Sequence, residues 1–184
     1  SAVVNLGSLS GALNQPGQIR IVNENGQWFG LLHNTGGSLL KLSFGASLSN
    51  VPTTSLLISG VGYINSGLAV GKDAVHGYVC VISGSSNQFT VLRLGNSIAA
   101  PNPVADVITS ASVPNPNNLG DIDLIQVCGN WYGLADNLGN GNIYRLDFGS
   151  SLFSSPAINQ VQTLAAANPG RIRWAQEGDR YYFL

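Results

Sequence analysis

The sequence predicts an all-β fold, in the form of a β-propeller-like array of four-stranded antiparallel blades. Three observations predict it. The sequence repeats with a period of about 50 residues, each repeat holds four short apolar segments of strand rather than helical periodicity, and turn residues separate these segments. The repeats make up a single domain, 1–184, which we divide into a repeat tail, three whole repeats and a repeat head: 1–17, 18–67, 68–120, 121–170 and 171–184.

The repeat is clearest in two copies that are offset by 103 positions, so that Trp131 superposes on Trp28 and Gly133 on Gly30. Each copy continues into Leu-x-Phe-Gly-x-Ser-Leu, and a proline follows four residues later. The middle copy is more diverged, and a fourth copy begins at Arg171. Four antiparallel strands in a unit of about 50 residues are typical of a propeller blade.

The first repeat predicts four strands in order. The first, 19–23, is followed by Asn25-Gly26, a hairpin signal because Asn and Gly tolerate the positive φ of tight turns. The second strand is 28–33, the third is 39–44, where apolar and polar residues alternate, and the fourth is 54–58. The third repeat predicts the same four strands, at 122–127, 131–136, 142–148 and 159–164.

Large aromatic residues occur on the second strand of each clear repeat. We expect them to pack between blades, with a ligand platform as the alternative. Gly30 and Gly133 follow them and are expected to allow close approach of a neighbouring sheet. The aromatic residues are Trp28, Phe29, Trp131, Tyr132, Tyr181 and Tyr182.

The two ends of the sequence predict a shared last blade. Residues 2–6 resemble an outer strand, and 171–176 with 180–184 resemble the two inner strands of one blade. Propellers often close by sharing a blade between the chain termini, which removes open sheet edges. The last blade is therefore expected to be shared between the termini or between chains, through self-association, unless the chain is a piece of a longer propeller.

Composition limits the partners. Charged residues are 9% of the sequence, against about 25% in ordinary soluble domains, and the formal net charge is −1. This excludes the basic surface that nucleic acid or an anionic membrane requires. No apolar run approaches the roughly 20 residues that cross a bilayer, so no membrane insertion is expected. A weakly charged surface rich in Asn, Ser and Gly favours an extracellular or cell-surface location.

Neither the cysteines nor the histidines form a motif. The spacing of Cys80 and Cys128 predicts neither a disulfide nor a zinc site, so two free thiols are expected. His33 ends a strand and His76 lies in a turn, and both are expected to be solvated loop residues. The carboxylates form no paired motif, and Asp121-Ile-Asp123 is interpreted as a strand start. We therefore predict no catalytic residue, metal or cofactor.

Two sets of residues are candidate ligand-binding positions. Equivalent positions on the innermost strands hold Arg20, Val70, Asp123 and Arg173, and an Arg–Asp–Arg cluster there could line the channel mouth of a ring. Ion pairing is the alternative role for that cluster. The second set ends the second strands and is expected to form part of one loop face, where a turn-capping role is the alternative. This set is His33, Asn34, Asp136 and Asn137.

The segments Gly26-Gln-Trp-Phe-Gly30 and Gly129-Asn-Trp-Tyr-Gly133, with Leu42–Leu48 and Leu146–Leu152, resemble a repeat of secreted and surface proteins of Bacteroidota. Those proteins often carry polycystic-kidney-disease-type or gliding-motility-associated C-terminal domains. The resemblance spans nearly the whole chain but is strict in two repeats. It implies a propeller in an exported, surface-associated protein, and it brings no catalytic motif.

The sequence therefore predicts a non-catalytic extracellular binding or assembly module, of the surface or adhesin type, that contacts a glycan, a surface protein or copies of itself. A polysaccharide-acting propeller hydrolase or lyase is the alternative, with a site at the axis built from Arg20, Asp123 and Arg173. A third possibility is a structural fibre subunit assembled by strand complementation.

Overall fold

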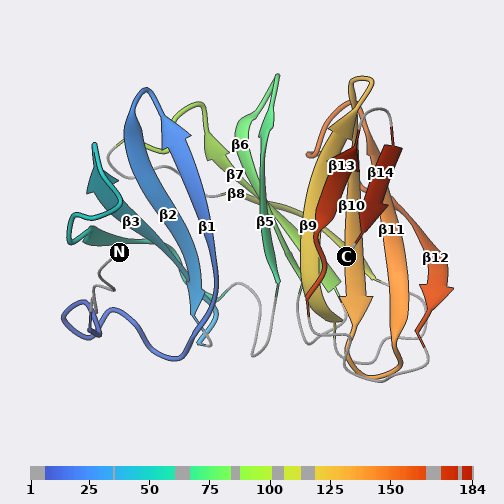
Figure 1. Ribbon diagram of the computed structural model, residues 1–184, viewed down its shortest axis with the longest axis horizontal. Coiled ribbons are helices and arrows are strands. Elements are labelled where there is room, and N and C mark those ends of the chain that lie inside the picture. The colour runs from blue at the N-terminus through green and yellow to red at the C-terminus, as the bar shows by residue number, and fades with distance from the viewer. Residues whose placement is uncertain are drawn as a thin grey trace.

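The computed structural model shows an all-β protein with three four-stranded antiparallel sheets and one two-stranded hairpin (Figure 1). It contains no helix in the described residues, and none therefore that could cross a membrane. The residues that the structure describes are 7–34, 36–60, 67–83, 88–100, 106–112, 119–164, 171–177 and 180–183.

Each sheet is a meander in which strands that follow one another in the chain are hydrogen-bonded neighbours. The first sheet consists of β1 (Pro16–Glu24), β2 (Gln27–Asn34), β3 (Ser38–Gly45) and β4 (Thr53–Ile58). The second sheet consists of β5 (Leu68–Asp73), β6 (Gly77–Ser83), β7 (Gln88–Gly95) and β8 (Asp106–Ser112). The third sheet consists of β9 (Leu119–Val127), β10 (Asn130–Asn137), β11 (Asn142–Gly149) and β12 (Ala157–Thr163). The hairpin consists of β13 (Trp174–Glu177) and β14 (Arg180–Phe183).

These strands confirm the four-stranded units predicted for the first and third repeats, with ends that differ by up to three residues. The predicted hairpin turn is also confirmed. Asn25 and Gly26 both have positive φ, 52° and 78°, and they connect the paired residues Glu24 and Gln27. The expected outer strand at 2–6 lies outside the described residues.

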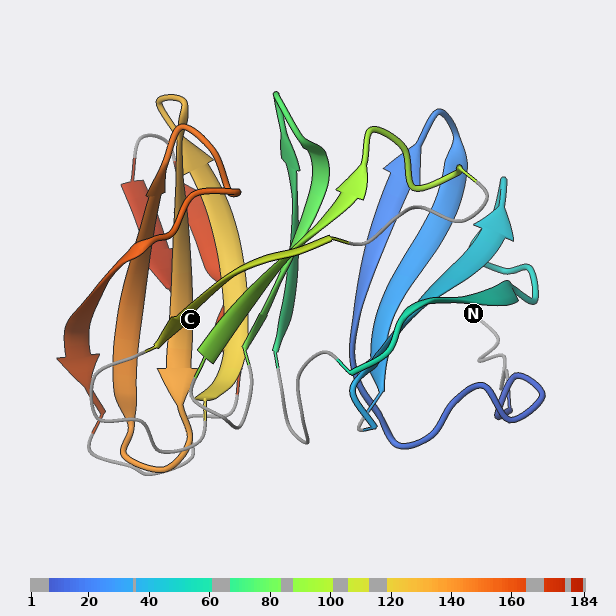
Figure 2. The ribbon, with the colours of Figure 1, turned by 180° about the vertical axis from the view of Figure 1, so that it is seen from behind.

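The sheets stack in a row, with their first strands next to one another (Figures 1 and 2). One apolar cluster joins the first and second sheets, where Phe29 and Leu31 meet Tyr78 and Ile82. Another joins the second and third sheets through residues such as Val79 and Trp131. The second sheet is therefore covered on both faces, which explains why every residue of β6 is buried.

The expectation that second-strand aromatics pack between sheets is confirmed for Phe29 and Trp131, and Tyr78 of the second sheet packs in the same way. Trp28 instead packs on the outward face of the first sheet, where Leu9 and Leu13 also lie. The difference arises because adjacent strand residues point to opposite faces, and the first sheet has a neighbouring sheet on one face only among the described residues.

Gly30 and Gly133 do not mark the close approach of a neighbouring sheet, so that prediction was wrong. A Cβ atom at Gly30 would meet Ile19 and Leu42 of its own sheet, and one at Gly133 would meet side chains of its own sheet as well. The close approach occurs at Gly71, on the first strand of the second sheet. A Cβ atom there would lie 3.0 Å from Cη2 of Trp131 and closer still to Cδ1 of Leu152, both from the third sheet.

A carboxylate at the end of the first strand binds the loop of the next sheet. Glu24 accepts a hydrogen bond of 2.7 Å from Oγ of Ser97 and one of 2.9 Å from the N–H of Ala99. Burial opposes ionisation of Glu24, but these hydrogen bonds prevail and lower its pKa. Lys41 supports the same loop, since its Nζ donates to the carbonyl oxygens of Ile98 and Ala100 at 3.3 and 3.2 Å.

The same contact recurs between the second and third sheets. Asp73 accepts a hydrogen bond of 2.8 Å from the N–H of Leu152. It also accepts from the N–H groups of Val75 and His76, at 2.8 and 3.0 Å. Burial opposes ionisation here too, but the hydrogen bonds lower the pKa of Asp73 to about 2. We call this arrangement the acid–loop contact: a carboxylate at the end of a first strand and the serine-containing loop of the following sheet.

Candidate functional site

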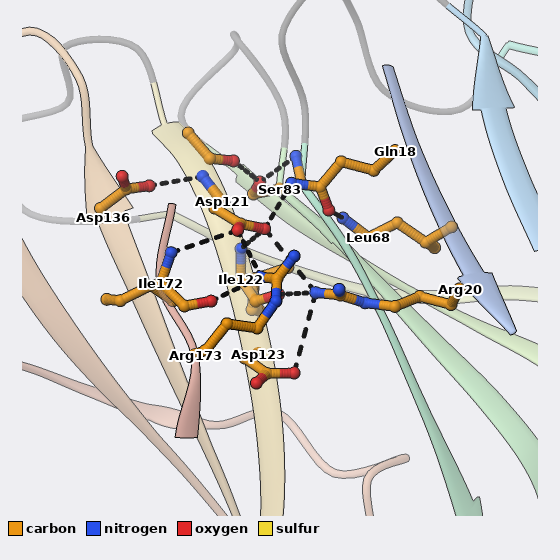
Figure 3. Close-up of polar contacts among 12 residues, drawn as sticks. Gln18, Arg20, Leu68, Ser83, Asp121, Ile122, Asp123, Asp136, Ile172 and Arg173 are labelled. Atoms are coloured by element: carbon orange, nitrogen blue, oxygen red, sulfur yellow. Dashed lines mark hydrogen bonds and ion pairs between the residues drawn. The ribbon is translucent and has the colours of Figure 1, made fainter. Parts of the chain in front are cut away.

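The first strands of the first and third sheets bring a charged cluster together (Figure 3). Arg20 comes from β1, Asp121 and Asp123 come from β9, and Arg173 precedes β13. Nη2 of Arg20 lies 3.7 Å from Oδ1 of Asp121 and 3.7 Å from Oδ1 of Asp123. Nη1 of Arg173 lies 2.5 Å from Oδ2 of Asp121. The structure therefore places the predicted residues Arg20, Asp123 and Arg173 around a fourth residue, Asp121.

Asp121 is the centre of the cluster, and its side chain is almost fully buried. Its Oδ1 accepts hydrogen bonds from Nε2 of Gln18, at 2.5 Å, and from the N–H of Ile122, at 2.8 Å. Its Oδ2 accepts from the N–H of Ile172, at 3.2 Å, and from Arg173. Both carboxylate oxygens are thus used by groups of the first strand, the third sheet and the segment before the hairpin.

Arg20 is partly buried and bridges the first and third sheets. Its Nη2 donates a hydrogen bond of 2.8 Å to the carbonyl oxygen of Ile122. Burial lowers the pKa of Arg20, and the nearby charge of Arg173 adds to this effect, whereas Asp123 and Asp121 oppose it. The carboxylates thus offset part of the cost of burying this guanidinium.

Asp123 connects the third sheet to the hairpin, because its Oδ2 accepts a hydrogen bond of 3.1 Å from the N–H of Trp174. The second sheet joins the cluster through backbone groups. Oε1 of Gln18 accepts a hydrogen bond of 2.8 Å from the N–H of Leu68. Oγ of Ser83 accepts a hydrogen bond of 2.7 Å from the N–H of Gly67, and it donates one to the carbonyl oxygen of Gly120 in the third sheet. The cluster therefore links all three sheets and the hairpin.

Val70 does not occupy the position equivalent to Arg20 and Asp123. Strand pairing places Arg20 opposite Leu31 and Asp123 opposite Leu134, whereas the corresponding pair in the second sheet is Ala69 and Val81. The predicted position of Val70 was wrong because the turns differ in length. The β5–β6 turn has three residues between its paired ends, Asp73 and Gly77, whereas the β1–β2 turn has two.

The second predicted set is buried, so it does not form an exposed loop face. His33, Asn34, Asp136 and Asn137 are each at most 3% exposed, and they end strands of two different sheets. Asn34 lies under the N-terminal segment, where its Nδ2 donates to the carbonyl oxygen of Ala12 at 2.9 Å. Oδ1 of Asn137 accepts a hydrogen bond of 3.1 Å from the N–H of Gly139, which is the turn-capping role.

Asp136 contacts the charged cluster, because its Oδ1 accepts a hydrogen bond from the N–H of Asp121. Burial raises the pKa of Asp136 to about 6, and the negative charge of Asp121 contributes to the rise, against the hydrogen bond from the Asp121 N–H. Its Oδ2 is buried and has no hydrogen-bond partner among the described residues.

The prediction for His33 was wrong, because His33 is buried, whereas His76 lies in a turn, as predicted, with a side chain that is 26% exposed. His33 is 1% exposed because it faces the interior of the stacked sheets. His76 lies against the third sheet: its Nδ1 is 3.2 Å from Oδ1 of Asp73 and 3.2 Å from Oγ of Ser151, and its ring lies 4.6 Å from that of Phe153. The serine and the carboxylate meet the same ring nitrogen, which is not the geometry of a nucleophile–base–acid arrangement.

The two cysteines lie in different sheets and are free. Cys80 is buried, and burial raises the pKa of its thiol strongly. Cys128 is exposed and takes the first position of the β9–β10 turn, with a positive φ of 49°. Among the described residues, no group of three or more His, Cys, Asp and Glu side chains could hold a metal ion.

A pocket of about 560 Å³ lies between the third sheet and the hairpin. Its walls combine three aromatic residues, Tyr132, Trp174 and Tyr181, with an ion pair between Arg145 and Asp147. In that pair, Nε of Arg145 donates to Oδ1 of Asp147 at 2.8 Å, and its Nη2 donates to Oδ2 at 3.0 Å. The hydrogen bond with Asp147 raises the pKa of Arg145. The other lining residues are Ile125, Val127, Asn130 and Gly149.

The pocket places aromatic faces beside fixed polar groups. Tyr132 and Tyr181 were predicted as aromatic residues between sheets, with a ligand platform as the alternative, whereas Trp174, Arg145 and Asp147 were not predicted for this site. The signal was present as alternation in β11, where Arg145 and Asp147 point to one face and Leu146 and Phe148 to the other. Comparison with protein-family models and with curated proteins gave no match for this chain.

Proposed function

We propose that this chain is a non-catalytic binding module of the propeller type that acts outside the cell, and that the pocket between the third sheet and the hairpin binds a carbohydrate. The row of four-stranded meanders with adjacent first strands supports the propeller arrangement. The low content of charged residues, 9%, supports the extracellular location.

One observation carries the assignment of ligand: the pocket joins three aromatic side chains to a fixed ion pair. Aromatic faces bind apolar surfaces, and ligand sites typically combine them with a few placed polar groups. Sugar rings have both features, since their C–H faces are apolar and their hydroxyl groups donate and accept hydrogen bonds.

The charged cluster supports a non-catalytic role. The Asp121 carboxylate is occupied by hydrogen bonds from three backbone or side-chain groups and by ion pairs, and Asp123 is bound to the hairpin backbone. Carboxylates that hold sheets together are poorly placed to act as an acid or a base on a substrate.

The experiment is a binding titration with a panel of neutral and acidic oligosaccharides, followed by tryptophan fluorescence and calorimetry. We expect Kd to rise at least tenfold in Tyr181→Ala and Arg145→Ala. Tyr182→Ala is the matched control, because Tyr182 is adjacent in β14, is exposed to a similar degree and does not line the pocket.

Two results would contradict the proposal. Absence of binding across the panel would contradict the proposal that the pocket binds a carbohydrate. New reducing ends after incubation with a polysaccharide would contradict the non-catalytic role. Their absence in Asp123→Asn would favour the hydrolase alternative, with its site at the charged cluster.

A further inference from the structure

The outward face of the first sheet exposes apolar residues whose equivalents are buried in the other sheets. By strand pairing, Ile19 corresponds to Leu68 and Ile122. Ile19 is 42% exposed, whereas Leu68 and Ile122 are 0% exposed because each packs in a cluster with the preceding sheet. Ile21, on the same face of β1, is 43% exposed.

The loop after β3 shows the same difference. Leu48 corresponds to Ile98 and Leu152. Each of the three lies three residues after a glycine that pairs with the aromatic residue of the second strand: Gly45 with Trp28, Gly95 with Tyr78 and Gly149 with Trp131. Leu48 is 44% exposed, whereas Ile98 and Leu152 are 0% exposed. Of the segment before β1, the described residues Leu9, Ala12 and Leu13 pack on the part of this face formed by β2 and β3.

The exposed loop already has the conformation that its equivalents adopt in the acid–loop contact. The N–H of Ser49 donates to Oγ of Ser47 at 3.2 Å. The corresponding hydrogen bonds are 3.1 Å from Ala99 to Ser97 and 3.2 Å from Phe153 to Ser151. The loop with Ser97 binds Glu24, and the loop with Ser151 binds Asp73. Among the described residues, no carboxylate binds Ser47.

The hairpin carries the complementary groups. Glu177 pairs with Arg180, as Glu24 pairs with Gln27, so Glu177 occupies the position of the acid in the acid–loop contact. Tyr182 corresponds to Phe29, which packs against the second sheet. Tyr182 is 40% exposed and is adjacent to the pocket residue Tyr181, so it points away from the third sheet.

We propose that the hairpin of one molecule binds the outward face of the first sheet of a second copy of this chain. In this contact Glu177 accepts hydrogen bonds from the 47–49 loop, as Glu24 does from the 97–99 loop, and Tyr182 covers Leu48 and Ile21. The second sheet lies between the first sheet and the hairpin within one molecule (Figures 1 and 2), so the hairpin of the same molecule does not cover this face, and we assign the contact to a second copy.

The contact is heterologous, because it joins two different surfaces. Such a contact forms a closed ring when the rotation between copies closes, and an open filament when it does not. It continues the stacking that joins the first to the second sheet and the second to the third. It goes beyond carbohydrate binding and does not depend on it.

The test uses the full chain with two blocked variants, Leu48→Asp and Tyr182→Asp, and light scattering over a range of concentrations. We expect wild type to form assemblies of more than one chain and each variant alone to remain monomeric. A mixture of the two variants should form a one-to-one complex, because each retains the surface that the other lacks. Val161→Asp is the control, since Val161 is 42% exposed on β12 and lies outside the contact.

A further variant, Glu177→Ala, should raise Kd for assembly at least tenfold, and Glu177→Gln, which keeps a hydrogen-bond acceptor, should recover part of the loss. A monomeric wild type would overturn the inference and leave the carbohydrate proposal standing. Assembly that persists in both aspartate variants would overturn it as well and would favour strand addition at a sheet edge. The oligosaccharide titration of each variant separates this failure from a failure of the proposed function.

Discussion

Asp121 joins more elements than any other side chain described in the charged cluster. It binds Gln18 from the first sheet, Ile172 and Arg173 beside the hairpin, and its own strand. Its removal would leave the side-chain amide of Gln18 without its acceptor and the partly buried Arg20 without one of its two neighbouring carboxylates. Losing one member of a buried ion pair costs more than the pair contributes, because the remaining charge stays desolvated.

We therefore predict that Asp121→Ala lowers the free energy of unfolding by about 3 kcal/mol, measured by urea denaturation. The matched control is Asp147→Ala, which also removes a carboxylate from an arginine pair. Arg145 and Asp147 are 48% and 27% exposed in their side chains, so the loss should be about 0.5 kcal/mol. Equal losses in the two variants would contradict the central role of Asp121.

Asp136 should make stability depend on pH. Its folded pKa is about 6, above the ordinary value of 3.8, because it is buried. The folded state therefore favours the protonated form, so the contribution of Asp136 to stability is complete below pH 3.8 and is lost as the pH rises through 6. Asp136→Asn lacks this titration.

We expect the difference in unfolding free energy between Asp136→Asn and wild type to shift in favour of the variant by about 2 kcal/mol between pH 4 and pH 7. Urea denaturation at both pH values measures this shift. Asp73→Asn should change little over this range, because hydrogen bonds lower the pKa of Asp73 to about 2 and its contribution to stability is lost only below about pH 4. A constant difference across this range would contradict the burial of a titrating carboxyl at residue 136.

The sequence located part of this cluster but not its centre. Arg20, Asp123 and Arg173 were recognised because they are charged and occupy one position of a repeat, and the structure brings them together. Asp121 was interpreted as a strand start, because a single polar residue next to a strand usually caps it. The missing information was the packing of three sheets at one point, which residue spacing does not contain. His33 was misplaced for the same reason.

At the scale of elements, the contact between the second and third sheets depends on the absence of a side chain at residue 71. Gly71 lies against Trp131 and Leu152, and both of these side chains are buried. A methyl group there must displace Cδ1 of Leu152, the atom that it meets first, and it also crowds the indole ring of Trp131. Overpacking of this kind typically costs 1–3 kcal/mol.

We predict that Gly71→Ala lowers the free energy of unfolding by about 2 kcal/mol or more in urea denaturation. Gly133→Ala is the matched control in a strand of the adjacent sheet. A Cβ atom at Gly133 would lie 3.3 Å or more from its neighbours, and alanine restricts the unfolded chain, so the loss should stay below about 1 kcal/mol. A larger loss at residue 133 than at residue 71 would contradict the stacking of the two sheets.

Strands and turns were more accessible to sequence analysis than the packing between sheets. The Asn25-Gly26 turn was predicted correctly because positive φ at two successive residues limits the amino acids that can occupy it. The position of Val70 was wrong because the turn after Asp73 has one more residue. The role of Gly30 was wrong because a glycine on a strand does not reveal whether its own sheet or the next one approaches it.

At the scale of the whole molecule, the position of a sheet in the row should determine its local stability. The second sheet is covered on both faces, whereas the hairpin has two strands and exposes Tyr181, Tyr182 and Glu177. Local opening is easiest where few apolar contacts are lost. Stability should therefore fall from the second sheet towards the hairpin.

We predict that amide hydrogen exchange, measured by mass spectrometry or NMR, is slowest in β6 and fastest in the hairpin. β6 should exchange only with global unfolding, so its protection should match the free energy from urea denaturation. Faster exchange in β6 than in β2 or β10 would contradict the central position of the second sheet.

The acid–loop contact has a consequence for how such a chain could grow. The second sheet supplies an acid, Asp73, to its successor and a loop, 97–99, to its predecessor, so a tandem duplication of this unit in the gene would insert a copy that already carries both. The new copy would need no compensating mutation elsewhere. The two contacts also differ in detail, since Glu24 precedes a two-residue turn and the shorter Asp73 precedes a three-residue turn. Duplicated units can therefore diverge in sequence while the row of sheets is lengthened.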